Sequence, residues 1–221
     1  MNSHLIAIVG GSGSGKSWLA QHLAEQFGED AGRLSLDDFY RDLSHLRPEE
    51  RDATNFDHPS AIDWPLFHRV TSRISRGQAT ALPSYDFATH TRRATARGWQ
   101  PRRLVLIEGL WLLRYTDLRR LYSMSVFVEC PAHVRLERRL ERDQRERGRT
   151  AQSVQAQFDQ QVAPMHERFV TRQARHADFL LESPVTHTRL AELRACCNQR
   201  LYQAPVSQMP PSALRIPHCQ I

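Results

Sequence analysis

The chain contains 221 residues, of which 30 are lysine or arginine and 24 are aspartate or glutamate, so its formal charge is +6, and 40% of the residues are hydrophobic. This length fits one globular domain with a substantial core. No apolar run approaches the ~20 residues that a membrane-spanning helix needs, and the first residues lack the basic and apolar regions of a secretion signal. The composition therefore argues against transmembrane and secreted proteins.

The cysteines and lysines of the sequence indicate the compartment of the protein and a candidate functional residue. Cys130, Cys196, Cys197 and Cys219 have neither the spacing of a zinc site nor the density of a disulfide scaffold, so we expect a cytoplasmic protein. Lys16 is the single lysine, and every other positive charge is an arginine. Such a bias points to genomic composition rather than to a nucleic-acid footprint. We therefore expect neither a membrane nor a nucleic acid as partner, and Lys16 becomes a candidate functional residue.

The predicted elements alternate between strands and helices along the chain. Apolar runs of strand length occur at 5–9, 33–37, 104–107 and 125–128, with a weaker one at 179–181. The spacing of apolar residues, caps and glycines predicts helices over 18–27, 64–76, 132–147, 151–172 and 188–201. This order predicts an α/β fold with a parallel sheet flanked by helices on both faces. We expect one domain over residues 1–202, followed by a proline-rich, poorly ordered tail over 203–221.

A glycine-rich loop follows the first predicted strand and leads into the first predicted helix. Its sequence, GGSGSGKS over 10–17, matches the Walker A pattern, in which backbone N–H groups and the helix N-terminus bind phosphate. Lys16 would contact the β- and γ-phosphates, and the Ser17 hydroxyl would bind Mg²⁺. The expected nucleotide-binding residues are Gly10, Gly11, Ser12, Gly13, Ser14, Gly15, Lys16, Ser17 and Trp18. The loop predicts a P-loop NTPase fold, a three-layer sandwich that binds ATP or GTP with Mg²⁺.

Carboxylates follow two further predicted strands. Glu108 stands at the carboxyl end of the run 104–107, where ligands of parallel sheets bind, and we expect it to hold a metal-bound water; the alternative is a carboxylate that only caps the turn. Asp37 ends the run 33–37 and is the better candidate for a general base. Its neighbour Asp38 is the competing candidate.

Arginines are concentrated in the predicted helix 132–147 and the turn after it. They are Arg135, Arg138, Arg139, Arg142, Arg145, Arg147 and Arg149. Interleaved glutamates favour a solvated helix with surface ion pairs, and we expect this for Arg135, Arg138 and Arg145. From the residues alone the other four remain open between this interpretation and a cationic lid that closes over phosphates.

Several segments together resemble the uridine/cytidine kinase family of P-loop nucleoside kinases, a branch that also contains phosphoribulokinase-like enzymes. They are GGSGSGKS (10–17), LSLDDFY (34–40), NFDHPSAID (55–63), LPSYDFATHTR (82–92), LIEGLWLL (106–113), RRLERDQRERGR (138–149), Gln157 with VAPMHERF (162–169), and HADFLL (176–181). The resemblance covers nearly all of residues 5–181. It implies a kinase that phosphorylates the 5′-hydroxyl of uridine or cytidine, and it suggests a homo-oligomer.

The resemblance also implies roles for individual residues. Asp37 would be the catalytic base, with Lys16, Arg142 and Arg147 stabilising charge from the loop and from an arginine-rich helical lid over about 138–150. The nucleoside would be bound by Tyr40, Phe56, Asp57, Tyr85, Phe87, His90, Arg139, Arg149 and Gln157. Asp57 would accept hydrogen bonds from the ribose hydroxyls, so we expect ribonucleosides to be preferred over deoxyribonucleosides. His90 would read the exocyclic group of the pyrimidine.

Three positions depart from the family pattern. Trp18 replaces the small hydroxyl residue that usually follows the Walker serine or threonine, and Asp38 stands where relatives often have serine. The turn 182–185 lacks the glycine of a turn that usually surrounds the nucleotide base. The choice between ATP and GTP as donor is therefore open.

Two other functions remain as alternatives. A phosphoribulokinase-like enzyme acting on a sugar phosphate would need extra cations in the acceptor pocket, for which Arg92 and Arg93 are the candidates. A non-catalytic protein that binds nucleotide and RNA through its arginines would not need to keep Lys16, Ser17 and Asp37.

Overall fold

A computed structural model describes residues 2–201, and the tail expected over 203–221 lies outside this part. Five strands form one parallel sheet in the order β2-β7-β1-β8-β9. Their bounds are His4–Gly10 (β1), Ala31–Ser35 (β2), Leu104–Gly109 (β7), Met124–Glu129 (β8) and Phe179–Glu182 (β9). The predicted parallel sheet is thus confirmed, with the phosphate loop leaving its central strand.

The register of the central strands brings the loop and the acidic residues to one edge of the sheet. Ile8 of β1 pairs with Glu108 of β7, and Ser35 of β2 pairs with the same glutamate. Because the strands are parallel, their carboxyl ends all meet at this edge. The end of β1, where Gly10 begins the loop, therefore lies beside Glu108.

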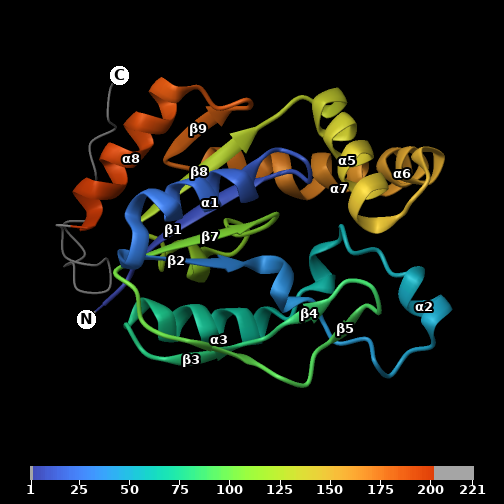
Figure 1. The fold of residues 1–221 in the computed structure, drawn as a ribbon, viewed down its shortest axis with the longest axis horizontal. Helices are drawn as coiled ribbons and strands as arrows, with labels where there is room; N and C mark the ends of the chain where they lie inside the picture. Colours follow the sequence, from blue (N-terminus) through green and yellow to red (C-terminus); the bar gives the residue numbers. More distant parts are fainter. Residues whose placement is uncertain (1, 202–221) are drawn as a thin grey trace.

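Helices cover both faces of the sheet (Figure 1). On one face, α1 (Lys16–Phe27) and α8 (His187–Leu201) pack against Ile6 and Ile8 of β1. On the other face, α3 (Trp64–Ser75) packs against Leu5 and Val9. The alternation of side chains along β1 supplies both cores at once, because successive residues of a strand point to opposite faces. These layers confirm the predicted three-layer α/β sandwich.

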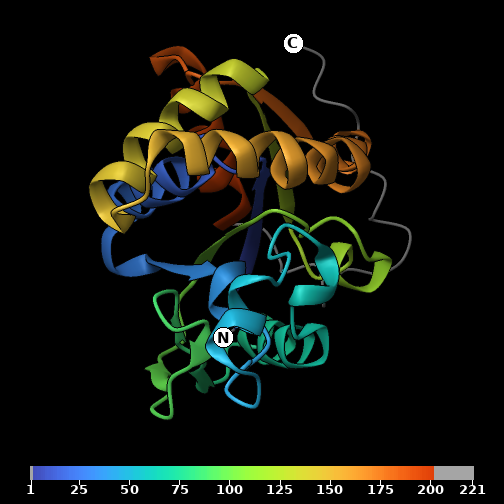
Figure 2. The ribbon, with the colours of Figure 1, turned by 90° about the vertical axis from the view of Figure 1, so that its right-hand side faces the viewer.

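Further elements gather at the carboxyl edge of the sheet, which faces the viewer in Figure 2. On the α1 side lie α5 (Ala132–Arg147) and a helical segment over 151–176 that includes α6 (Ala151–Gln157) and α7 (Ala163–Met165). On the α3 side of this edge lie α2 (Pro48–Asp52) and the pair β4 (Tyr85–Asp86) and β5 (Thr91–Arg92). The pair β3 (Thr80–Leu82) and β6 (Arg97–Trp99) packs along α3 away from this edge, with Trp99 close to Gly32 of β2, and α4 (Thr116–Arg119) lies in the connection from β7 to β8. The two sides face each other across the phosphate loop (Figures 1 and 2).

Two predicted boundaries differ from the structure. The run 33–37 is strand only to Ser35, whose hydroxyl accepts a hydrogen bond from the Asp37 N–H and so begins a 3₁₀ turn over Leu36–Phe39. The helix expected over 151–172 extends to residue 176 and contains two π-helical turns, Phe158–Val162 and His166–Val170. None of the helices within residues 2–201 is long and apolar enough to cross a membrane.

The contact between α3 and the turn that contains Asp37 provides a test of the core. The ring of Phe67 is fully buried and meets the edge of Phe39 at 5.0 Å between centroids. We expect Phe67→Ala to lower the free energy of unfolding by about 3–5 kcal/mol, because it removes a buried ring and leaves a cavity. Urea unfolding checks this, with the exposed neighbour His68→Ala as control, expected within about 0.5 kcal/mol of the wild type. Equal effects of the two substitutions would contradict this account.

Candidate active site

The phosphate loop begins as β1 ends and leads directly into α1. Gly13 and Gly15 have φ angles of 81° and 92°, which favour glycine, and a Cβ on Gly13 would lie 2.5 Å from the carbonyl oxygen of Arg135. The first helical hydrogen bond runs from the Leu19 N–H to the Gly15 carbonyl. The N–H groups of Lys16, Ser17 and Trp18 therefore have no acceptor within the helix, which suits them to an anion.

Oxygen ligands meet beside this loop. The Glu108 carboxylate accepts hydrogen bonds from the hydroxyls of Ser17, at 3.1 Å, and Ser35, at 2.7 Å. Glu108 itself is only 6% exposed. Within residues 2–201 no group of three or more His, Cys, Asp or Glu side chains forms a metal cage. Hydroxyl and carboxylate oxygens fit a Mg²⁺ ion that takes its other ligands from phosphate and water. Sequence reasoning missed Ser35, which lies opposite Glu108 in the sheet register.

Asp37 lies in a buried electrostatic cluster. Burial, reinforced by the charges of Glu108, Asp38 and Asp57, raises the pKa of Asp37 to about 6, although Lys16 acts to lower it. The structure therefore brings the predicted base close to the phosphate-loop lysine. Its competitor Asp38 faces a different group, since its carboxylate lies 3.9 Å from the guanidinium of Arg97.

Aromatic side chains form a wall next to Asp37. The hydroxyl of Tyr40 donates to the Phe56 carbonyl at 3.1 Å, and its ring contacts Phe56, Tyr85 and Phe87 with centroids 5.3, 5.3 and 6.4 Å apart. The imidazole of His90 stacks on Phe56 at 4.4 Å and 20°. His90 is also the one non-glycine residue with positive φ within residues 2–201, at 54°. The structure thus gathers five predicted nucleoside-binding residues into one cluster.

The β4–β5 hairpin is tied to this wall by Arg92. Its guanidinium donates to the Tyr40 carbonyl at 2.8 Å and forms an ion pair with Asp63 at 3.4 Å. Arg93 forms an ion pair with Asp86 at 3.5 Å. Both arginines, which sequence reasoning considered as cations for a phosphorylated acceptor, are therefore engaged by carboxylates of the protein.

Asp57 links the acceptor side to the arginine-rich helix. Burial raises the pKa of Asp57, while the nearby charges of Arg139, Lys16, Arg142 and Arg147 act to lower it. The carboxylate is thus surrounded by cations that come from both the loop and α5. This is the junction at which the predicted base, the predicted ribose-binding residue and the predicted lid meet.

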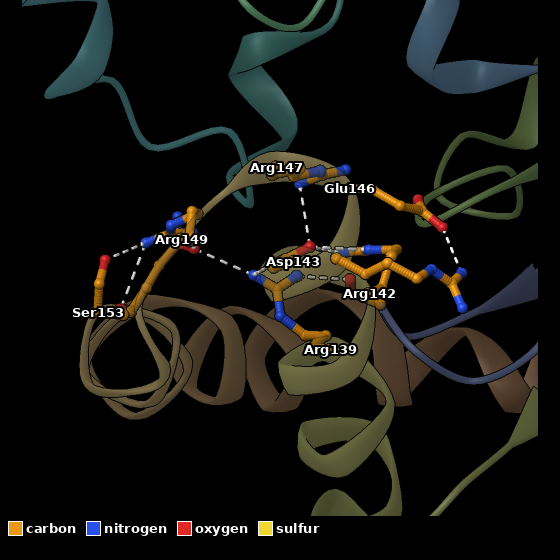
Figure 3. A network of polar contacts seen from close by, with 10 residues as sticks. Arg139, Arg142, Asp143, Glu146, Arg147, Arg149 and Ser153 are labelled. Carbon is orange, nitrogen blue, oxygen red and sulfur yellow. Dashed lines mark hydrogen bonds and ion pairs between the residues drawn. The ribbon is translucent and has the colours of Figure 1, made fainter.

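The arginines of α5 are organised around a buried acid, Asp143 (Figure 3). Its fully buried carboxylate pairs with Arg142 at 2.8 Å, Arg147 at 3.5 Å and Arg139 at 3.6 Å. Sequence reasoning missed Asp143, although arginines at i−4, i−1 and i+4 were a usable signal. The acid explains how three guanidinium groups share one small space.

Gln157 connects this cluster to the helical segment that follows. Its side-chain oxygen accepts hydrogen bonds from Arg139, at 3.0 Å, and from Arg149. Arg139 also donates to the Ser12 hydroxyl of the phosphate loop at 2.6 Å. The predicted residues Arg139, Arg149 and Gln157 are therefore brought together and anchored to the loop.

The expectation of a solvated surface is wrong for Arg135 and Arg138. Arg135 is only 2% exposed, donates to the Cys130 carbonyl and lies over the ring of Phe158. Arg138 donates to the Gly13 carbonyl at 3.2 Å and to the Ser183 hydroxyl at 2.9 Å. Both side chains face the phosphate loop, because the face of α5 that carries them packs on this loop. The periodicity of the sequence did not indicate which face of the helix would pack there.

Arg145 agrees with the expectation of surface ion pairs. Its guanidinium pairs with Glu146 at 2.6 Å and Glu141 at 3.7 Å, and all three side chains are exposed. Pairs of this kind contribute little to stability.

A family model described as the phosphoribulokinase/uridine kinase family matches residues 5–189. The chain belongs to this family. It is 38% identical over 179 residues to a uridine kinase of Halobacterium salinarum, covering 81% of this chain and 80% of the relative. It is 39% identical over 181 residues to a uridine kinase of Brevibacillus brevis, covering 81% and 85% of the two chains. These likenesses show an ATP-dependent phosphotransferase.

Solved structures agree on the fold. The chain superimposes on a phosphoribulokinase from Rhodobacter spheroides with a TM-score of 0.62 at 16% identity, over 82% of this chain and 70% of that one. A D-glycerate 3-kinase from Cryptococcus neoformans gives a TM-score of 0.54 at 20% identity, over 75% and 78% of the two chains. At these identities the likeness concerns the P-loop kinase fold alone.

The raised pKa of Asp37 predicts an effect on stability. The raised pKa means that the folded state favours the protonated Asp37 carboxyl. The contribution of Asp37 to the free energy of unfolding is therefore fully present below the ordinary pKa of 3.8, and it is lost as the pH rises through about 6. We therefore expect Asp37→Asn to raise the free energy of unfolding at pH 8 by about 1–3 kcal/mol, with the gain vanishing near pH 3.5. Urea unfolding at several pH values checks this.

The exposed Asp117 offers a matched control for this measurement. Its carboxylate is 80% exposed, so Asp117→Asn should show no comparable gain at pH 8. An Asp37→Asn protein that is less stable than the wild type at pH 8 would overturn the account, since it would mean that the ionised carboxylate is favourable there.

Proposed function

We propose that this protein transfers the γ-phosphoryl group of ATP or GTP to the 5′-hydroxyl of uridine or cytidine, giving UMP or CMP. The observation that carries the proposal is the position of Asp37, whose charge interacts both with Lys16 of the phosphate loop and with Tyr40 of the aromatic wall. A carboxylate there reaches both a hydroxyl acceptor and the phosphoryl group that it attacks. The free thiols of Cys130 and Cys197 support a cytoplasmic site of action.

In this proposal Asp37 is the general base. The 5′-hydroxyl loses its proton to the Asp37 carboxylate, its oxygen forms a bond to the γ-phosphorus, and the bond from that phosphorus to the β-phosphate oxygen breaks. A base with a pKa of about 6 is ionised at neutral pH yet remains basic enough to accept the proton.

Cations on two sides of the phosphates stabilise the charge that develops. Lys16 acts from the loop, and Arg142 and Arg147 act from α5, where Asp143 holds their guanidinium groups. Ser17 and Glu108 would hold Mg²⁺, which neutralises phosphate charge when bound. Closure of these cations over the donor excludes water from the reaction.

The acceptor pocket suits a pyrimidine ribonucleoside. Phe56 and Phe87 offer apolar surface to a planar base, with the buried Tyr85 packed against both, and His90, stacked on Phe56, offers a polar edge to its exocyclic group. Asp57 can accept two hydrogen bonds from the vicinal hydroxyls of ribose. Arg139, Arg149 and Gln157 complete the site through their mutual hydrogen bonds.

The two alternatives are less well supported. A phosphorylated acceptor needs unengaged cations in the pocket, whereas Arg92 and Arg93 already pair with Asp63 and Asp86. A non-catalytic nucleotide-binding protein would not need Asp37 beside Lys16 and Glu108 in one buried cluster.

A direct assay tests the reaction. We expect Mg²⁺-ATP to be converted to ADP when uridine or cytidine is added, and not with ribulose 5-phosphate or adenosine. The kcat/KM for uridine should rise with pH through about 6 and then level off, because Asp37 accepts the proton only when ionised. Asp37→Asn should lower kcat by about 10²–10⁴-fold, the usual contribution of a general base.

The comparison with Asp38→Asn makes this assay specific. Asp38 faces Arg97 and should be dispensable for the chemistry, so its substitution should leave kcat within about threefold. A loss with Asp38→Asn rather than with Asp37→Asn would transfer the role of base to Asp38. Turnover with none of the pyrimidine nucleosides would contradict the proposed acceptor.

The sugar preference tests Asp57. We expect 2′-deoxyuridine to be phosphorylated with a kcat/KM about 10- to 100-fold lower than that of uridine, because the half-buried Asp57 would then keep an unused acceptor. Asp57→Ala should lower kcat/KM for uridine and bring the two substrates to within about threefold of each other. Steady-state kinetics with both nucleosides measures this, and an unchanged ratio in the variant would contradict the role of Asp57.

A further inference from the structure

Trp18 is an exposed aromatic residue with no place in the core. Its side chain is 54% exposed, and its indole stacks on the imidazole of His22 at 5.0 Å between centroids and 10° between planes. The other three tryptophans differ, since Trp99 and Trp111 are buried and Trp64 is half-buried. The indole therefore presents a flat apolar face to solvent at the start of α1, directly after the phosphate loop.

The neighbours of Trp18 define where that partner would lie. The charge of Lys16 acts on Asp37 and Asp57, and the Ser17 hydroxyl donates to Glu108, so both side chains belong to the end of the site where transfer takes place. Successive residues of a helix point ~100° apart, so the Trp18 side chain leaves α1 on another face than Ser17. His22 follows one turn later on the same face and supports the indole.

The backbone N–H of Trp18 also indicates where the base of the donor would lie. Its N–H is the last of the three in the first turn of α1 that have no helical acceptor. With the γ-phosphate at Lys16 and Asp37, this N–H suits the phosphate farthest from the acceptor. The sugar and base attached to that phosphate then extend out over the N-terminal turn of α1, where the indole stands.

The loop after β9 borders the same face. Gly15 lies three residues before Trp18, and a Cβ on Gly15 would lie 3.6 Å from Arg138 Nη1 and 3.7 Å from the Ser183 hydroxyl. Arg138 joins Ser183 to the Gly13 carbonyl, so this loop is anchored against the phosphate loop. The face therefore has the β9–α8 loop on one side and the Trp18–His22 stack on the other.

We propose that Trp18, backed by His22, is the stacking surface for the purine base of the phosphoryl donor. The inference rests on the proposed function, because it needs a nucleoside triphosphate on the phosphate loop. Stacking on an aromatic ring tolerates any base, since every base has a π-face. The enzyme should therefore accept ATP and GTP with KM values within about threefold of each other.

Binding of ADP and of pyrophosphate to the full chain separates the base from the phosphates. By isothermal titration calorimetry, Trp18→Ala should weaken ADP about tenfold, the usual loss for one base–aromatic stack, and leave pyrophosphate within about twofold. Tyr115→Ala is the matched control, because Tyr115 is an exposed aromatic residue that packs on Trp64 away from the loop. It should change neither affinity.

Intrinsic fluorescence gives an independent measurement. ADP should quench the emission of the wild type, because the exposed Trp18 comes into contact with the base. Trp18→Phe should lose this quenching while keeping ADP affinity within about threefold, since a phenyl ring still stacks. In steady-state kinetics, Trp18→Ala should raise the KM for ATP about tenfold with kcat within about twofold.

The inference fails if Trp18→Ala leaves ADP affinity unchanged, or if it weakens ADP and pyrophosphate equally, which would indicate an effect on the loop itself. It also fails if the substitution changes the oligomeric state by size-exclusion chromatography while ADP affinity is kept, because Trp18 would then be covered by a second copy. These binding measurements need no acceptor. Absence of turnover with uridine would therefore refute the proposed function and leave the test of Trp18 intact.

Discussion

The site depends on holding several carboxylates close together in a buried space at one edge of the sheet. Asp37, Glu108 and Asp57 repel one another there, and burial adds to the free energy of ionisation. Lys16 and two serine hydroxyls offset part of that cost, since Ser17 and Ser35 both donate to Glu108. The parallel register of β1, β2 and β7 brings Lys16, Asp37 and Glu108 together, because all three strands end at this edge.

The arginines of α5 are the opposite case, because here several positive charges lie close together and repel one another. Asp143 takes up three of them through ion pairs while being fully buried itself. Removing one partner of such a buried network is strongly destabilising, whereas the intact network is no more stable than an apolar core of similar volume. The network therefore fixes the positions of the guanidinium groups more than it stabilises the fold. Arg142 and Arg147 are thereby held around Asp143 (Figure 3).

The acceptor wall relies on a contact between distant parts of the chain. Arg92 of β5 reaches the Tyr40 carbonyl and Asp63, which also accepts from the Leu66 N–H at the start of α3. One short hairpin, the turn after β2 and α3 are thus connected through a single guanidinium. Because the hairpin strands are two residues each, this connection and the stack of His90 on Phe56 hold the hairpin against the wall.

The sequence by itself determined the fold class, the phosphate loop, four of the five sheet strands closely, and the family. It could do so because buried parallel strands, glycine-rich loops and the order of elements are local signals. Only the tertiary structure decided which face of α5 packs on the loop, and therefore that Arg135 is buried, that Arg138 donates to the Gly13 carbonyl and that Asp143 is the buried acid. It also decided that Ser35 lies opposite Glu108 and that Arg92 is engaged by Asp63. Such pairings join residues 29 to 73 positions apart, and no local pattern specifies them, because they arise from sheet register and helix packing.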